Sequence, residues 1–239
     1  MPLPKIATPT YELELPSTGK TIKYRPFLVK EEKLLVLALE SEDTKEITTA
    51  IRNVIKNCIQ TRGIKVEQLP TFDIEYLFLN IRGKSVGEEI EINVLCPDDG
   101  ETYVPVKIDI DDIKVSKSED HTNQIKLDDS LVMQLKYPSL DQFIKNNFDF
   151  SNTNNVDQSF EMIASCIDKI FNAEEVWVGE DCTKKEMNEF LEQMNSSQFK
   201  EIEKFFETMP KLSHEVTVIN PKTEVESKVL LEGLVSFFA

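Results

Sequence analysis

Residues 89–110, EIEINVLCPDDGETYVPVKIDI, contain the pattern that decides the fold. Apolar residues alternate with polar ones at positions 90, 92 and 94, and again at positions 104, 106, 108 and 110. A Cys-Pro-Asp-Asp-Gly turn separates the two runs. Alternation with a period of two indicates strands that bury one face, and a short turn between two such strands indicates a β-hairpin.

The residues before this hairpin predict helices. Apolar residues recur at intervals of three and four between Ile47 and Ile59, which buries one helix face over several turns. Asp43 and Glu46 have the spacing of a capping box at the start of that helix. Residues 74–81 carry a second apolar stripe. Strands and helices in one chain predict the α+β class.

The same order of elements occurs twice, and matched landmarks lie 113 residues apart for Tyr24 and Tyr137, and 108 apart for Cys58 and Cys166. We therefore predict two diverged tandem units, 1–115 and 125–239, joined by a polar linker at 116–124. The alternative is that α+β domains often begin and end with hairpins by chance. The predicted elements are hairpins at 11–24, 90–110, 125–137 and 216–231, a short helix after Ser139, one helix across 160–171, and helices opening at Thr183 and at Ser196 or Ser197.

Composition and charge exclude several classes of protein. The chain has 43 acidic and 27 basic residues, a formal charge of −16, which disfavours nucleic acid and anionic membranes as partners. Its longest apolar stretches, such as Leu34 to Leu39, are too short to span a bilayer, and no signal peptide follows Met1. The four cysteines are far apart, as expected of reduced thiols in a cytoplasm.

The sequence offers no catalytic, cofactor-binding or metal-ligating residues. His121 and His214 are the only histidines and are predicted to be surface residues, and phosphate-binding glycine motifs are absent. A Cys-Pro turn begins a zinc ribbon, but Asp98 and Asp99 stand where a second cysteine would follow Cys96. The hairpins are therefore expected to be zinc-ribbon-like without a metal, and no cofactor is predicted.

Two apolar segments could bind a partner. One is the C-terminus from residue 230, and the other is residues 26–29, between the first hairpin and the next helix. In both cases the alternative is that the segment packs into the protein's own core. The candidate partner-binding residues are Pro26, Phe27, Leu28, Leu234, Phe237 and Phe238.

Three passages together point to a known family: LPSTGK (15–20) with YRPFLVKEEK (24–33), FDIEYLF (72–78) with Arg82 and SVGE (85–88), and LEGL (231–234) with Phe237 and Phe238. They resemble the baseplate hub family of T-even-type contractile-tailed bacteriophages. The resemblance implies a late viral protein in the host cytoplasm, with baseplate hub proteins as partners and no enzyme activity. It also implies cysteine pairs in the hairpin turns of some relatives, whereas this chain keeps only Cys96.

Three functions are compatible with these observations. The first is an assembly factor or chaperone for the baseplate hub, and the second is a permanent structural subunit of the hub in the virion. The third, a small cytoplasmic hydrolase, would need a pocket with converging polar groups, and the sequence has no candidate nucleophile paired with a base.

Overall fold

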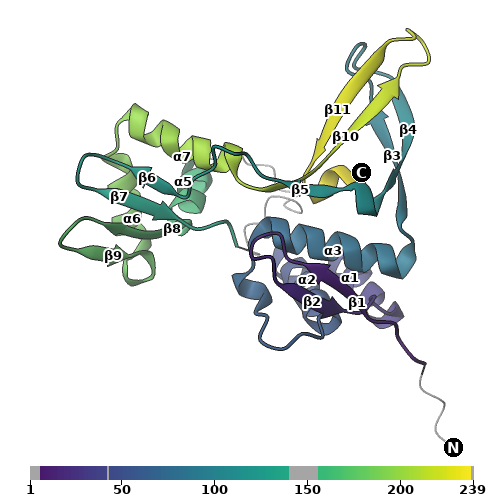
Figure 1. Cartoon of the computed structure of the whole chain (residues 1–239), viewed down its shortest axis with the longest axis horizontal. Helices are drawn as coiled ribbons and strands as arrows, with labels where there is room; N and C mark the ends of the chain where they lie inside the picture. The colour runs from purple at the N-terminus through teal and green to yellow at the C-terminus, as the bar shows by residue number, and fades with distance from the viewer. Residues whose placement is uncertain (1–5, 42, 140–155, 238–239) are drawn as a thin grey trace, which may run out of the picture.

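The computed structural model describes residues 6–41, 43–139 and 156–237 (Figure 1). Helices and small antiparallel sheets alternate along the chain, so the α+β prediction is confirmed. Figure 1 shows the N-terminal helices at the lower right with two long hairpins above them, and a second group of strands and helices on the left. Within the described ranges, no helix is both long and apolar enough to cross a membrane.

The N-terminal part is a hairpin packed on helices. Asp43 accepts a hydrogen bond from the backbone N–H of Glu46 (3.2 Å), as the capping-box spacing predicts, and the next helix buries Ile47, Ile51 and Ile55. The elements are β1 (Tyr11–Glu14), β2 (Thr21–Tyr24), α1 (Val29–Glu40), α2 (Thr44–Cys58), η1 (Val66–Gln68) and α3 (Thr71–Val86).

Two long hairpins form an arm above these helices (Figure 1). The hairpins predicted at 90–110 and 216–231 are both present, as β3 paired to β4 and β10 paired to β11. Strand β5 adds to the edge of β10. Their buried faces belong to the same core as residues of α2 and α3. The elements are β3 (Glu89–Leu95), β4 (Tyr103–Asp109), η2 (Ile110–Asp112), β5 (Lys114–Ser116), β10 (Lys211–Ile219), β11 (Glu226–Glu232) and η4 (Leu234–Phe237).

The remaining elements enclose a second core around a sheet of order β6-β7-β8-β9. Thr183 and Glu186 form the predicted capping box, and the following helix begins after Asn195, whose own capping box uses Gln198. The elements are β6 (Gln124–Lys126), β7 (Val132–Leu135), α5 (Val156–Ser165), β8 (Ile167–Phe171), β9 (Val176–Val178), η3 (Gly179–Asp181), α6 (Lys184–Glu192) and α7 (Ser196–Thr208).

The prediction of one helix across 160–171 is wrong after Ser165. Residues 167–171 form β8, which lies between β7 and β9. Ile167 and Ile170 are buried at a spacing of three, which fits a helix face, but the irregular pairing of β8 with β7 buries the same two residues from a strand. The short helix predicted after Ser139 lies outside the described residues.

The linker histidine is not a surface residue, which corrects the prediction for His121. Its ring is half-buried, stacks on Tyr137 and contacts Phe205, and its nitrogens lie 3.0 Å from the hydroxyls of Thr208 and Tyr137. Tyr137 in turn meets Phe72 of α3 edge to face at 5.1 Å. These aromatic rings connect the elements of the second core to α3.

The two halves share a connection between hairpin and helix. After β2, the backbone N–H of Arg25 donates to the carbonyl oxygen of Cys58 at the end of α2 (2.9 Å). After β7, the N–H of Lys136 donates to the carbonyl of Cys166 just after α5 (2.7 Å). In each half the residue after the second hairpin strand is thus hydrogen-bonded to a buried cysteine at, or directly after, the end of a helix.

The turns of the two long hairpins also match. The N–H of Gly100 donates to the carbonyl of Cys96 (3.0 Å), and the N–H of Glu224 donates to the carbonyl of Asn220 (2.8 Å). Gly100 and Glu224 both have a left-handed backbone, with φ of 65° and 60°. Glu224 is the one non-glycine residue with positive φ among those described, so the shared turn geometry persists without a glycine.

A carboxylate joins the two turns. Asp98 accepts hydrogen bonds from the Asn220 side-chain amide (3.0 and 3.1 Å) and from the Thr223 hydroxyl. These hydrogen bonds lower the pKa of Asp98, and the one from Thr223 has the larger effect. We call this set of three residues the tip latch.

Candidate protein-binding surface

Helix α1 exposes apolar side chains where a surface helix normally shows polar ones. Val29 is 79% exposed, Leu34 47%, Val36 49% and Leu37 52%. The preceding residue Leu28 is 40% exposed. We call these five residues the α1 outer face.

The inward side of α1 is built around a charged residue. Ala38 is buried, Leu35 packs against the first core, and Glu31, one turn before Leu35, is only 1% exposed. The polarity of the helix is therefore partly inverted, with a carboxylate inside and leucines outside.

An ion pair explains the buried carboxylate. Arg25 Nη2 lies 2.9 Å from Glu31 Oε1, the backbone N–H of Leu28 donates to Glu31 Oε2 (2.9 Å), and Lys30 Nζ lies 3.3 Å from Oε1. Burial raises the pKa of Glu31, but the hydrogen bonds from Arg25 and Leu28 outweigh it and hold the pKa below its usual value. Glu31 thereby fixes the first turn of α1 and the direction in which the α1 outer face points.

The segment before α1 is held at its other end by α3. The N–H of Phe27 donates to the Ser85 hydroxyl (2.9 Å), which donates to the carbonyl of Ile81. Pro26 is buried, and Phe27 packs on the small core cluster around Tyr24. Of the three predicted residues in this segment, the structure therefore leaves only Leu28 largely open to a partner.

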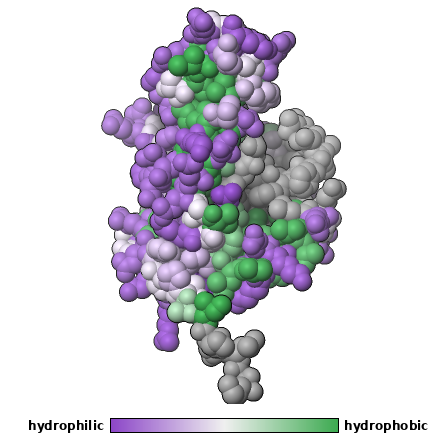
Figure 2. Space-filling model, turned by 90° about the vertical axis from the view of Figure 1, so that its right-hand side faces the viewer, coloured by the Kyte–Doolittle hydropathy of each residue, from purple (hydrophilic) through white to green (hydrophobic). Residues whose placement is uncertain are grey.

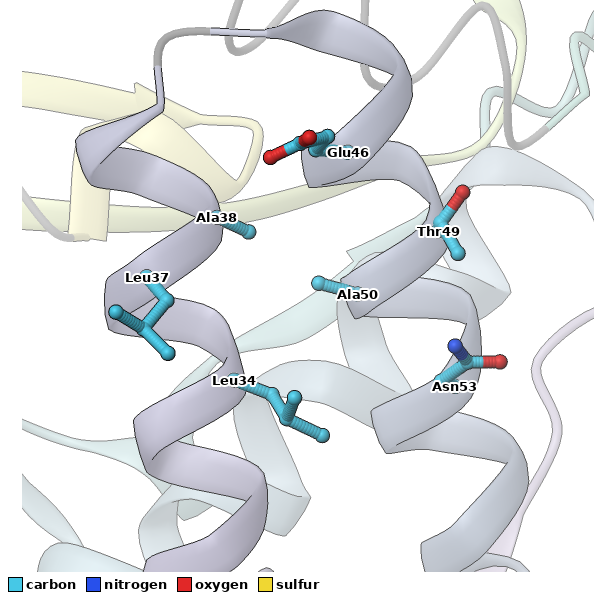
Figure 3. Close-up of a pocket in the computed structure, with 7 residues that line it drawn as sticks. All are labelled: Leu34, Leu37, Ala38, Glu46, Thr49, Ala50 and Asn53. Atoms are coloured by element: carbon cyan, nitrogen blue, oxygen red, sulfur yellow. The ribbon is translucent and has the colours of Figure 1, made fainter.

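A groove lies beside the α1 outer face, between α1 and α2. Its volume is about 390 Å³. In Figure 3, Leu34 of α1 points toward α2, and Ala38 and Ala50 face each other where the helices meet. The groove is largely open to solvent and is therefore shallow. The lining residues are Leu34, Leu37 and Ala38 from α1, and Glu46, Thr49, Ala50 and Asn53 from α2.

The groove has walls of different chemistry. The α1 wall is apolar, whereas the α2 wall carries a carboxylate, a hydroxyl and an amide (Figure 3). Such a groove can receive an apolar side chain and hydrogen-bond a neighbouring polar one, which is the usual composition of a protein-binding surface. Figure 2 shows hydrophobic surface in the lower half of one face, and a separate hydrophobic stretch at the top over the arm.

The C-terminal candidates have a different environment. Phe237 is 1% exposed and belongs to the first core, which fits the alternative that this segment packs on the protein itself. Leu234 lies at the start of η4, and Phe238 lies outside the described residues. The leucines of α1 were not among the predicted binding residues, although the near-continuous apolar run from Leu34 to Leu39 is more than one helix face can bury.

The four cysteines, all within the described residues, form no disulfide, and three of them are buried: Cys58, Cys96 and Cys166. Burial raises the pKa of Cys58 to about 11. A thiol with so high a pKa is a poor nucleophile at neutral pH. In the parts of the chain that the structure describes, no group of three or more histidine, cysteine, aspartate or glutamate side chains could hold a metal ion.

An exposed apolar helix face beside a shallow groove is typical of proteins that bind other proteins. The chain belongs to a bacteriophage family: the family model described as T4 bacteriophage base plate protein matches residues 8–239. No curated protein and no solved structure matches the chain significantly. Membership gives the protein a role in the phage tail baseplate and implies interactions with other baseplate proteins.

Proposed function

We propose that the protein is a non-catalytic assembly factor for the baseplate hub, and that it binds hub components through the α1 outer face. The observation that carries the proposal is the exposure of five apolar side chains on and beside one helix that is anchored by a buried ion pair. Membership of the baseplate family and the resemblance to hub proteins support the choice of partner.

The size of the α1 outer face supports a transient contact. Its side chains are 40–79% exposed. Burying the exposed part of each side chain against a partner contributes about 1 kcal/mol to the binding free energy, or about 5 kcal/mol for all five. The loss of translational and rotational freedom costs at least about 4 kcal/mol. Binding through this face alone is therefore weak and reversible, as an assembly factor requires.

We further propose that the chain consists of two diverged tandem units, 1–115 and 125–239, with residues 116–124 between them. The repeated bonds to Cys58 and Cys166 and the matched hairpin turns support this duplication. The last hairpin of the second unit packs in the core of the first, so the units fold as one body and present two different surfaces. One molecule could thereby hold two neighbouring hub components in a fixed relative orientation.

The alternative is a permanent structural subunit of the hub. Quantitative mass spectrometry of purified virions and of tail-assembly intermediates from infected cells separates the two roles. The proposal predicts that the protein is present in intermediates and absent or substoichiometric in virions. A fixed copy number in the virion, matched to the symmetry of the tail, would contradict it and establish the structural subunit.

A further inference from the structure

Strand β9 is an exposed apolar strand at the edge of the second sheet. It pairs only with β8 in the described sheet, whose order ends at β9. Its three residues are Val176, Trp177 and Val178, exposed by 60%, 40% and 41%. An apolar edge strand is a template for another strand, and proteins usually protect such edges with charge, proline or a covering element.

The backbone of β9 offers hydrogen-bonding groups at this edge. The N–H of Asn172 donates to the carbonyl of Glu175 (3.0 Å), which makes these two residues a hydrogen-bonded pair at the hairpin end. Hydrogen-bonded and non-hydrogen-bonded residue pairs alternate along an antiparallel sheet. The backbone of Trp177 therefore hydrogen-bonds to Ile170 of β8, while the backbone N–H groups of Val176 and Val178 point outward. The Val178 carbonyl already accepts a weak bond from the Cys182 thiol (3.5 Å).

The side chain of Trp177 in β9 continues the core face of the second sheet. Trp177 lies opposite Ile170, and therefore on the same face of the sheet as that buried residue of the second core. An apolar residue on an added strand would extend the core past Trp177. Directly after β9 the chain stays close to β8, because Gly179 approaches the Ile167 carbonyl so closely that a Cβ would lie 2.2 Å from the oxygen.

The charges at both ends of β9 determine what can pair with it. Glu174 and Glu175 precede the strand, Glu180 and Asp181 follow it, and all four are exposed. Lys136 Nζ lies 3.8 Å from Glu180 Oε1 and partly neutralises that carboxylate, while Glu174, Glu175 and Asp181 stay exposed. A second copy of this chain, paired antiparallel about Trp177, would place Glu174 opposite Glu180, and like charges directly opposite each other are destabilising.

We infer that β9 docks an extended segment of another protein as a fifth strand, and that this segment has alternating apolar residues flanked by lysine or arginine at both ends. The backbone N–H groups of Val176 and Val178 bind the segment, Trp177 packs on its apolar residues, and the acidic ends select its charge. The surface is separate from the α1 outer face, and the inference stands without the proposed function.

The test uses the full chain and the fluorescence of Trp177, the single tryptophan in the sequence. The probe is the synthetic peptide Ac-KRTVTVTVRK-NH2, and the control is the charge-reversed peptide Ac-EETVTVTVEE-NH2. The basic peptide should shift the Trp177 emission to shorter wavelength and protect it from acrylamide. The acidic peptide should bind about tenfold more weakly, and the difference should shrink at high salt.

Two variants locate the contact. Val176→Pro removes an outward N–H without breaking the pairing with β8, and should weaken peptide binding about fivefold, whereas Val176→Thr keeps the N–H and should bind within about twofold of wild type. No change in Trp177 emission with the basic peptide, equal binding of both peptides, or equal binding by both variants would overturn the inference. Loss of hub binding by α1 variants would leave it intact.

Discussion

Replacing Glu31 with glutamine tests whether the buried ion pair holds α1 in place. The amide of Glu31→Gln can still accept the N–H of Leu28, but it no longer neutralises Arg25, which is only 14% exposed. Loss of a charge-assisted hydrogen bond at a buried site costs about 2–3 kcal/mol. For a chain of this length that corresponds to a fall in melting temperature of roughly 5–10 °C. Urea and thermal unfolding followed by circular dichroism measure both quantities, with the exposed Glu32→Gln as control, expected within about 0.5 kcal/mol of wild type.

The pH dependence gives the same prediction a second readout. The pKa of Glu31 in the folded protein lies below its ordinary value of 4.5. Its contribution to stability is therefore complete above pH 4.5 and is lost as the pH falls through the folded pKa. The difference in unfolding free energy between wild type and Glu31→Gln should be full at pH 7 and should shrink steadily as the pH falls below 4.5 through the folded pKa. A difference that does not change with pH, or one no larger than that of Glu32→Gln, would refute the role assigned to the ion pair.

Three further predictions concern the core, the arm and the second sheet. Phe237→Ala should lower the unfolding free energy by about 3–5 kcal/mol while the exposed Leu230→Ala changes it by less than about 0.5 kcal/mol, and equal effects in urea unfolding would mean that the C-terminus is not core. Asp98→Ala should speed amide hydrogen exchange in residues 96–102 and 220–225, and unchanged exchange would show that the tip latch does not join the hairpins. Gly179→Ala should cost about 1–3 kcal/mol in urea unfolding followed by Trp177 fluorescence, because its Cβ would clash with the Ile167 carbonyl; wild-type stability would contradict that packing.

The sequence predicted most of the local structure because strong periodic signals coincide there with the final packing. The hairpins at β3–β4 and β10–β11 alternate strictly, and the side-chain cap at Asp43 and the capping box at Thr183 start helices where they were expected. The helix predicted across 160–171 ended early because Ile167 and Ile170 have the spacing of a helix face, whereas the irregular pairing with β7 buries both of them from a strand. That strand lies more than thirty residues away, so the local pattern contains no information about it.

The candidate site was predictable only in part. Residues 26–29 were identified, but Pro26 and Phe27 pack inward through contacts with α2 and α3 that no local pattern reveals. The exposed leucines of α1 depend on Arg25, which allows Glu31 to occupy the buried side of the helix. A helix whose charged residue is inside cannot be oriented from hydrophobic periodicity, because that method places charge outward.

The most direct test of the central claim is capture of baseplate hub proteins from infected cells by a tagged variant that carries Leu34→Gln and Leu37→Gln. Glutamine preserves helix propensity, and the control is Leu230→Gln on the arm, where the leucine is at least as exposed as Leu34 and Leu37. We predict that the α1 variant retains the circular dichroism spectrum of the wild type but captures at least about tenfold less of the hub proteins identified by mass spectrometry, while the control captures the wild-type amount. Equal capture by the α1 variant and the control would contradict the assignment of the α1 outer face as the binding surface.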